Sequence, residues 1–144
     1  MRKRTIGREV ALQVLYQLDL RGEELLDRAE ELLREANEDS EVLDFAKKLV
    51  TGTWEHRVRI DQHIESVAAN WELSRMAAVD RNILRLATYE LCFCDDIPPL
   101  VSINEAIEMA KKFSTKNSGP FVNGILDNIR LRCAPEKKSQ GRPE

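Results

Sequence analysis

The sequence predicts an all-α protein, and three observations lead to this fold class. Apolar residues recur at intervals of three and four along nearly the whole chain, which places them on one face of a helix. No segment shows the alternation of apolar and polar residues that is typical of a half-buried strand. The chain has 144 residues, of which 42% are hydrophobic and 33% charged, so it has the length of one domain and a globular composition.

The first half of the sequence predicts three helices. Their apolar faces run over residues 7–20, 25–36 and 40–67. Gly22 is placed to end the first helix, because glycine is common just past a helix C-terminus. Ser40 is placed to cap the third, since a serine hydroxyl can accept a hydrogen bond from the free amides at a helix N-terminus. A short connector around Trp71 follows.

A central helix is predicted over residues 79–94. It is apolar on most of its sides, which is typical of a helix that its neighbours bury. Arg81 and Arg85 lie one turn apart on it, and buried charges need partners. Pairing within the bundle is therefore favoured for both, and a partner-docking face is the alternative.

Two more helices are predicted towards the C-terminus. The dipeptide Pro98-Pro99 ends the central helix. The segment Ser102-Ile-Asn-Glu105 matches a capping box, so it predicts a helix that begins there and continues to Phe113. A last helix begins near Pro120, because proline in the first turn of a helix costs no hydrogen bond.

No residue pattern points to a catalytic or metal centre. Phosphate-binding glycine loops, zinc-protease motifs and nucleophile elbows are all missing from the sequence. The three cysteines, Cys92, Cys94 and Cys133, are an odd number without disulfide spacing, and we expect small buried side chains. Their spacing does not fit a zinc site, and His56 and His63 are expected to be structural. We therefore predict no metal and no cofactor.

Charge is distributed unevenly along the chain. The net charge is −3, but the first ten residues are basic and residues 23–44 are acidic. Residues 1–6 are expected to form a flexible basic arm, a local footprint for a polyanion, with a solvated arm as the alternative. Residues 134–144 are expected to be a disordered tail. No apolar run is long enough for a membrane span or a signal peptide, which predicts a cytoplasmic protein.

Three sequence blocks resemble those of a known family. They are VDRNILRLATYEL at 79–91, VSINEAIEMAKKF at 101–113 and SGPFVNGILDNI at 118–129. In this order they are similar to the signature blocks of the NusB family of bacterial transcription antitermination factors. The resemblance implies a compact helical domain over residues 1–133, with about seven helices in two packed bundles. It also implies a protein that is not an enzyme.

The resemblance further implies a function and partners. Family members bind the boxA element of nascent, single-stranded RNA together with the ribosomal protein NusE. With NusA and NusG they help the elongating RNA polymerase to read through terminators in ribosomal-RNA operons. A homodimer is possible for the free protein. Two alternatives stay open from the sequence: a helical scaffold that binds only proteins, and an RNA-docking accessory module of a ribosomal-RNA methyltransferase.

By position, the family's RNA-binding surface maps onto the basic arm and onto the loop between the last two helices. The residues are Arg2, Lys3, Arg4, Arg8, Phe113, Asn117 and Phe121. The surface for NusE lies along the central helix, where Asp80 is the partner-binding candidate. Unpaired RNA bases stack on aromatic rings, so a loop with a phenylalanine on each shoulder suits such a ligand. Phe121 is favoured as the stacking ring, whereas Phe113 closes an apolar stripe and is expected to be at least half core.

Overall fold

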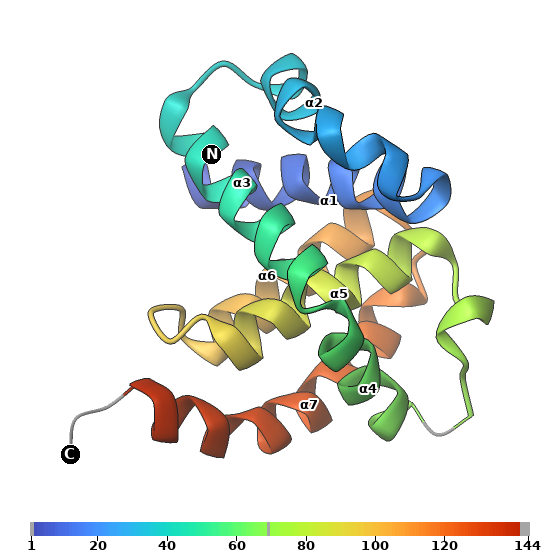
Figure 1. The fold of residues 1–144 in the computed structure, drawn as a ribbon. Coiled ribbons are helices and arrows are strands. Elements are labelled where there is room, and N and C mark those ends of the chain that lie inside the picture. The colour runs from blue at the N-terminus through green and yellow to red at the C-terminus, as the bar shows by residue number, and fades with distance from the viewer. Residues whose placement is uncertain (1, 69, 142–144) are drawn as a thin grey trace. The chain divides into compact units, whose positions relative to one another are not determined.

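A computed structural model of the chain describes residues 2–68 and 70–141, with side chains described as far as Cys133. Within these residues there are helices and no strands, which confirms the all-α prediction (Figure 1). The elements are α1 (Lys3–Arg21), the 3-10 helix η1 (Glu23–Arg28), α2 (Ala29–Ala36), α3 (Ser40–Glu55), α4 (Arg57–Val67), the 3-10 helix η2 (Leu73–Arg75), α5 (Ala78–Phe93), α6 (Pro99–Phe113) and α7 (Ser118–Gly141).

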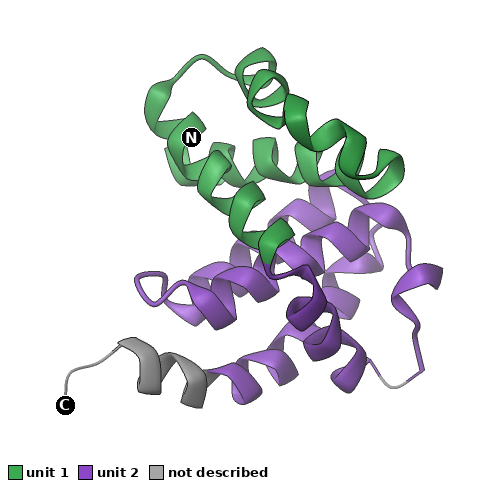
Figure 2. Ribbon diagram, viewed as in Figure 1, with its two compact units in different colours: residues 1–55 green, residues 56–144 purple. Residues whose placement is uncertain are grey.

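The chain divides into two compact units, residues 1–55 and residues 56–144 (Figure 2). The expectation of one domain over residues 1–133 stays a prediction. Of the expected disordered tail, residues 134–141 are the end of helix α7, and residues 142–144 lie outside the described residues.

In the first unit, α1 packs closely on α3. A Cβ atom added at Gly7 would lie 2.9 Å from Cδ2 of Phe45 and 3.4 Å from the carbonyl oxygen of Val42. Only glycine therefore fits where the two helices meet. Gly22 ends α1 with a φ of +83°, and its amide donates to the carbonyl of Leu18 over 2.8 Å. This confirms the predicted helix end, because glycine adopts a positive φ without steric cost.

Three predicted boundaries in the first half are wrong. The first helix begins at Lys3, so residues 3–6 are helical where the sequence favoured a flexible arm. The cap of α3 is Asp39: its Oδ1 accepts from the amides of Glu41 at 2.9 Å and Val42 at 3.1 Å. Ser40 is already helical. The predicted long helix over 40–67 is two helices, α3 and α4, which are separated at His56.

In the second unit, α5 is the central helix, as predicted. It contacts α4, α6 and α7. Ile83, Leu84 and Leu86 are fully buried on it. Burial of large aliphatic side chains on several sides of one helix supplies most of the stability of such a unit, because apolar area removed from water contributes about 25 cal/mol per Å².

The two arginines of α5 are paired within this unit, as the sequence favoured. Arg81 donates through Nη1 to the backbone carbonyls of Leu73 at 3.1 Å and Met76 at 3.2 Å. Arg85 forms a bidentate pair with Asp61 of α4, at 2.8 and 3.0 Å. Both guanidinium groups therefore tie neighbouring segments to the central helix.

The predicted start of α6 is wrong by three residues. The helix begins at Pro99, with Pro98 in the N-cap position. Ser102 is buried one turn further on, and its hydroxyl donates to Oε1 of Glu90 over 2.8 Å. In the predicted capping box the Ser102 hydroxyl would bond a backbone amide of its own helix. In the structure it bonds the buried carboxylate of Glu90 on α5 instead.

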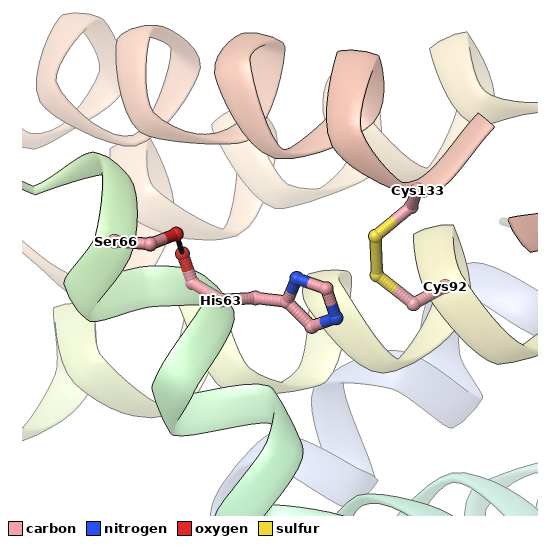
Figure 3. Close-up of a disulfide and its surroundings, with 4 residues drawn as sticks. All are labelled: His63, Ser66, Cys92 and Cys133. Carbon is pink, nitrogen blue, oxygen red and sulfur yellow. Dashed lines mark hydrogen bonds between the residues drawn. A yellow bond between two sulfur atoms is a disulfide. The ribbon is translucent and has the colours of Figure 1, made fainter. Parts of the chain in front are cut away.

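The prediction of unpaired cysteines is wrong for two of the three. Cys92 of α5 and Cys133 of α7 are joined by a disulfide across a sequence separation of 41 residues, with their Cα atoms 5.0 Å apart (Figure 3). Cys94 is buried, as predicted, and is not part of the disulfide. Packing of α5 on α7 brings the pair together, and no local sequence pattern shows that packing.

The pair formed by Asp61 and Arg85 should stabilise the second unit measurably. Their side chains are 27% and 18% exposed, so Asp61→Asn would remove a charge-assisted pair that is mostly shielded from solvent. We expect a loss of about 1–3 kcal/mol in the free energy of unfolding, the range for a charge-assisted hydrogen bond. Urea denaturation of Asp61→Asn, of a variant that removes the Arg85 charge, and of the double variant measures the coupling energy between the two side chains.

The matched control is Asp127→Asn, which breaks the more exposed pair with Arg130 within α7. That change should cost less than about 0.5 kcal/mol, because surface pairs contribute little. Equal losses at the two positions would contradict the structural role given to Asp61.

Candidate nucleic-acid interface

The loop between α6 and α7, residues 114–117, is held by one buried hydroxyl. Ser118 lies at the start of α7, and its Oγ is 2.9 Å from the hydroxyl of Ser114 and 3.1 Å from that of Thr115. The amide of Ser118 donates to the carbonyl of Thr115 over 3.0 Å. These short-range bonds fold the polar loop back on the helix start and fix its position.

The same hydroxyl joins the loop to α5. Ser118 donates to Oδ2 of Asp80 over 3.1 Å, a contact between residues that lie 38 positions apart. The second carboxylate oxygen of Asp80, Oδ1, is buried and accepts no hydrogen bond from the residues that the structure describes. An unsatisfied buried acceptor is costly, and a ligand with an N–H donor would remove that cost.

A cavity of about 280 Å³ opens beside this carboxylate. Its walls come from three segments of the second unit: the connector that precedes α5, the first turn of α5, and the loop and first turn of α7. The lining residues are Trp71, Arg75, Met76, Ala77, Asp80, Thr115, Asn117, Ser118 and Phe121. A mixed wall of aromatic rings and a few polar groups is typical of a small-ligand pocket.

Two aromatic rings form one wall of this pocket. The rings of Trp71 and Phe121 meet edge to face, with their centroids 5.6 Å apart and their planes at 72°. Trp71 is 54% exposed, whereas Phe121 is half-buried. The Trp71 indole holds the Phe121 ring in position by this contact. Parts of both rings stay in contact with solvent.

The predicted loop residues have different surroundings. Asn117 is exposed and lines the pocket together with Phe121. Phe113 is 36% exposed and does not line it; the Lys112 ammonium lies 5.3 Å from the centre of its ring. Asp80, expected from the resemblance to face a protein partner, is placed beside the predicted RNA residues.

The predicted basic residues lie in the first unit. Lys3 pairs with Asp39 at 3.0 Å and with Glu41 at 3.2 Å. The hydrogen bond that Lys3 donates to Asp39, with a smaller effect of the one it donates to Glu41, raises the pKa of Lys3 above its ordinary value of 10.5. The same bond from Lys3, with the backbone amide of Val42, lowers the pKa of Asp39 below its ordinary value of 3.8.

Arg4 and Arg8 both lie over the ring of Phe45 on α3. The guanidinium carbons are 4.6 and 5.3 Å from the ring centre. Arg8 is only 3% exposed, while Arg2 and Arg4 are exposed. Cation–π contact and burial thus give Arg8 a packing role in this unit.

Sequence reasoning named three of the nine lining residues, and four of those that it missed are Trp71, Arg75, Met76 and Ala77. They belong to the connector before α5, which has no periodic pattern. The tryptophan in this connector was the available signal, because tryptophan is enriched at binding interfaces. The sequence could not predict the contact of Trp71 with Phe121, because Phe121 lies in α7, 50 positions further along the chain.

The fold and the pocket define an all-helical protein with a surface cavity walled by two aromatic rings and a carboxylate. No helix in the described parts of the chain is long and apolar enough to cross a membrane. The chain belongs to the NusB family, whose sequence profile matches residues 5–130. The predicted family is thereby confirmed.

Individual relatives match over nearly the whole chain. The transcription antitermination protein NusB of Syntrophus aciditrophicus (strain SB) is 46% identical over 140 residues, 97% of this chain and 87% of that protein. Among solved structures, NusB of T. maritima is 40% identical with a TM-score of 0.81, covering 97% and 98% of the two chains. A chain in the crystal structure of the antitermination factors NusB and NusE in complex with double-stranded RNA is 34% identical, with a TM-score of 0.80 and coverage of 92% and 98%.

The cap formed by Asp39 should make stability depend on pH. Because its pKa is lowered in the folded protein, Asp39 stabilises the first unit above its ordinary pKa of 3.8. This contribution is lost as the pH falls through the lower folded value. Asp39→Ala should therefore lower the Tm at neutral pH, and its difference from the wild type should vanish in strong acid. Thermal melts followed by circular dichroism across pH 2–7 (roughly the range over which carboxylates titrate) measure this.

Ser40→Ala is the control for this prediction, because Ser40 is the neighbouring hydroxyl that the sequence favoured as the cap. It should leave the Tm nearly unchanged at every pH. A larger loss for Ser40→Ala than for Asp39→Ala would place the cap on the serine.

Proposed function

We propose that the protein is a non-enzymatic RNA-binding adaptor of transcription antitermination. It binds boxA-type single-stranded RNA together with the ribosomal protein NusE and supports processive transcription of ribosomal-RNA operons. The observation that carries this proposal is the pocket of Asp80, Trp71 and Phe121 in a chain of the NusB family. A related chain is in a complex with NusE and double-stranded RNA, which supports RNA and NusE as ligands here, whereas the preference for single-stranded boxA rests on the pocket and the family resemblance.

An unstacked base suits the pocket in size and chemistry. A flat ring can lie against Phe121, which is held in place by Trp71 at 5.6 Å. Stacking of a base on an aromatic side chain contributes about 1–3 kcal/mol. The volume of about 280 Å³ accommodates one base and leaves the ribose and phosphate outside.

Asp80 would give the pocket a preference among bases. A carboxylate only accepts hydrogen bonds, so it favours a base edge that carries donors. The amino groups of cytosine, adenine and guanine are such donors, whereas the uracil edge offers one ring N–H between two carbonyls. Because Oδ1 of Asp80 is buried, this contact would need a small movement of the pocket wall that exposes it, while Oδ2 remains bonded to Ser118.

The basic residues of the first unit would supply phosphate contacts. We assign these contacts to Arg2, Lys3 and Arg4, whose side chains are exposed. Arg8, also predicted from the family, would act indirectly by packing against Phe45 under Arg4. Lys3 would exchange its acidic partners for a phosphate.

The remaining parts of the proposal follow the family. The protein would act in the cytoplasm with NusE, NusA, NusG and the elongating polymerase, and without catalysis. A homodimer of the free protein and contact of Asp80 with NusE stay predictions. Asp80 lines the proposed base pocket. It could therefore lie where the RNA surface and the NusE surface meet, as the base-pocket and NusE-contact predictions both require.

Phe121→Ala tests the base pocket. The change should weaken binding of a short boxA RNA by about 1–3 kcal/mol, because the stacking surface is removed. The loss of folding free energy should stay below the roughly 3–5 kcal/mol of a fully buried ring. Fluorescence anisotropy with labelled RNA, single-stranded or annealed to its complement, gives the affinity, and urea titration gives the stability.

Phe113→Ala is the comparison variant, because Phe113 lies on the other shoulder of the same loop outside the pocket. It should lose less RNA affinity than Phe121→Ala. Asp80→Asn should weaken binding chiefly to RNA with an amino-bearing base in the pocket. If Phe121→Ala binds RNA as the wild type does at a temperature where it is folded, the pocket is not the base site.

The salt dependence of RNA binding should report three phosphate contacts from the first unit. Each contact with single-stranded RNA adds about −0.7 to the slope of log K against log salt, so Arg2, Lys3 and Arg4 together contribute about −2. Replacing all three by alanine should flatten the slope by this amount. Arg34→Ala, which removes an exposed arginine paired with Glu30 on α2, is the control and should leave the slope unchanged.

Arg8→Ala distinguishes a packing role of Arg8 from a direct contact with phosphate. It should lower the stability of the protein with little change in the salt slope. A slope that flattens as much for Arg8→Ala as for removal of Arg4 would make Arg8 a direct phosphate ligand.

A further inference from the structure

Three soft donor groups converge inside the second unit, away from the proposed RNA pocket. His63 projects from α4 towards Cys92 of α5 and Cys133 of α7 (Figure 3). One imidazole nitrogen and the two sulfur atoms all lie within 4.8 Å of one another. None of the three side chains lines the pocket or takes part in the contacts that position it.

Burial separates this cluster from ordinary surface residues. Cys92 and Cys133 are 0% and 1% exposed. His63 keeps some contact with solvent as a whole residue, but its Nδ1 is buried, so all three donor groups lie inside the unit. A buried thiolate pair with an imidazole is a donor set that soft metal ions prefer.

The spacing suits one metal ion once the disulfide is open. Metal–sulfur bonds of about 2.3 Å and metal–nitrogen bonds of about 2.0–2.1 Å place two ligands of the same ion roughly 3.5–4 Å apart. Two sulfur atoms that are no longer bonded separate to a similar distance by van der Waals repulsion. Small side-chain rotations within this group therefore convert the disulfide into a pair of ligands.

We propose that His63, Cys92 and Cys133 form a redox-gated site for a soft closed-shell cation. In the disulfide form the sulfurs are bonded to each other and the site cannot hold an ion. A dithiol reductant opens it: the reductant gives two electrons and two protons, becomes a cyclic disulfide, and leaves two cysteine thiols. The ion then displaces the thiol protons, and neutral His63 supplies a ring nitrogen.

The number of donors favours copper(I) over zinc. Among the described residues, the group of clustered donor side chains consists of these three. Structural zinc sites almost always have four protein ligands, so zinc would need a water as the fourth. Copper(I) is satisfied by three soft ligands, and we expect it to bind more tightly. The site is independent of the proposed RNA function.

Metal titration of the full chain tests the proposal. Protein reduced with dithiothreitol, and then freed of it under nitrogen, is titrated with copper(I) against bicinchoninate and separately with zinc(II) against a chromogenic chelator. The reduced protein should bind one equivalent of copper(I), whereas the oxidised protein should bind none at this site. A thiol assay before each titration establishes the redox state.

Variants identify the ligands. Cys133→Ala should abolish the one-equivalent binding, and His63→Gln should weaken it by more than about tenfold, since even residues behind the ligands change affinity by 10–100-fold. Cys94→Ala is the matched control, because Cys94 is a buried cysteine outside the disulfide, and it should bind as the wild type does. Circular dichroism confirms that each variant is folded.

Two results would overturn the proposal. One is that the reduced wild-type protein binds neither copper(I) nor zinc(II) stoichiometrically. In that case reduction of the disulfide does not create a metal site. The other is binding that His63→Gln leaves unchanged. The histidine variant decides the matter if Cys133→Ala does not fold, because it keeps both thiols and alters only a half-buried position.

Discussion

A helix that is buried against three neighbours needs partners for the charged side chains that it carries, and this requirement organises the second unit. Along α5, Asp80 accepts from Ser118, Arg81 donates to the carbonyls of Leu73 and Met76, and Arg85 pairs with Asp61. Further along, Glu90 accepts from Ser102. Because burying an unpaired charge costs several kcal/mol, these bonds select one arrangement of the neighbouring segments.

The candidate pocket follows from two of these bonds. Arg81 holds the connector that contains Leu73 and Met76, and so it positions the segment that carries Trp71. Asp80 holds the start of α7, and so it positions Phe121. Adjacent residues of α5 therefore bring together two aromatic rings that are 50 positions apart in sequence. The carboxylate that orders the pocket wall is itself one of the groups that line it.

Much of the fold could be predicted because it depends on local patterns. Apolar periodicity identified the helices, and Gly22 marked the end of α1. Apolar residues on most sides of the segment 79–94 identified the central helix. Two of the errors have a common cause. Ser102 fits a capping box but bonds Glu90, and Cys92 pairs with Cys133, because the partner in each case comes from another helix. A local pattern cannot show a competing partner that only tertiary packing supplies.

The candidate site was predicted unevenly for the same reason. Phe121, Asn117 and Asp80 came from a resemblance that carries positions, and the structure places all three at one pocket. Trp71 was missed because neither pattern nor resemblance marked the connector.

Charge was the weakest guide to which side chains are available. The basic N-terminus has four cations, but each one's surroundings decide what it can do. Phe45 holds Arg4 and Arg8 by its ring face, and Gly7 between them lets α1 approach α3 closely enough for both contacts. Arg8 is buried as a result, whereas Arg4 keeps contact with solvent. A cation becomes available to a polyanion only where packing has not already used it, so the helix that begins at Lys3 presents fewer charges than the sequence suggests.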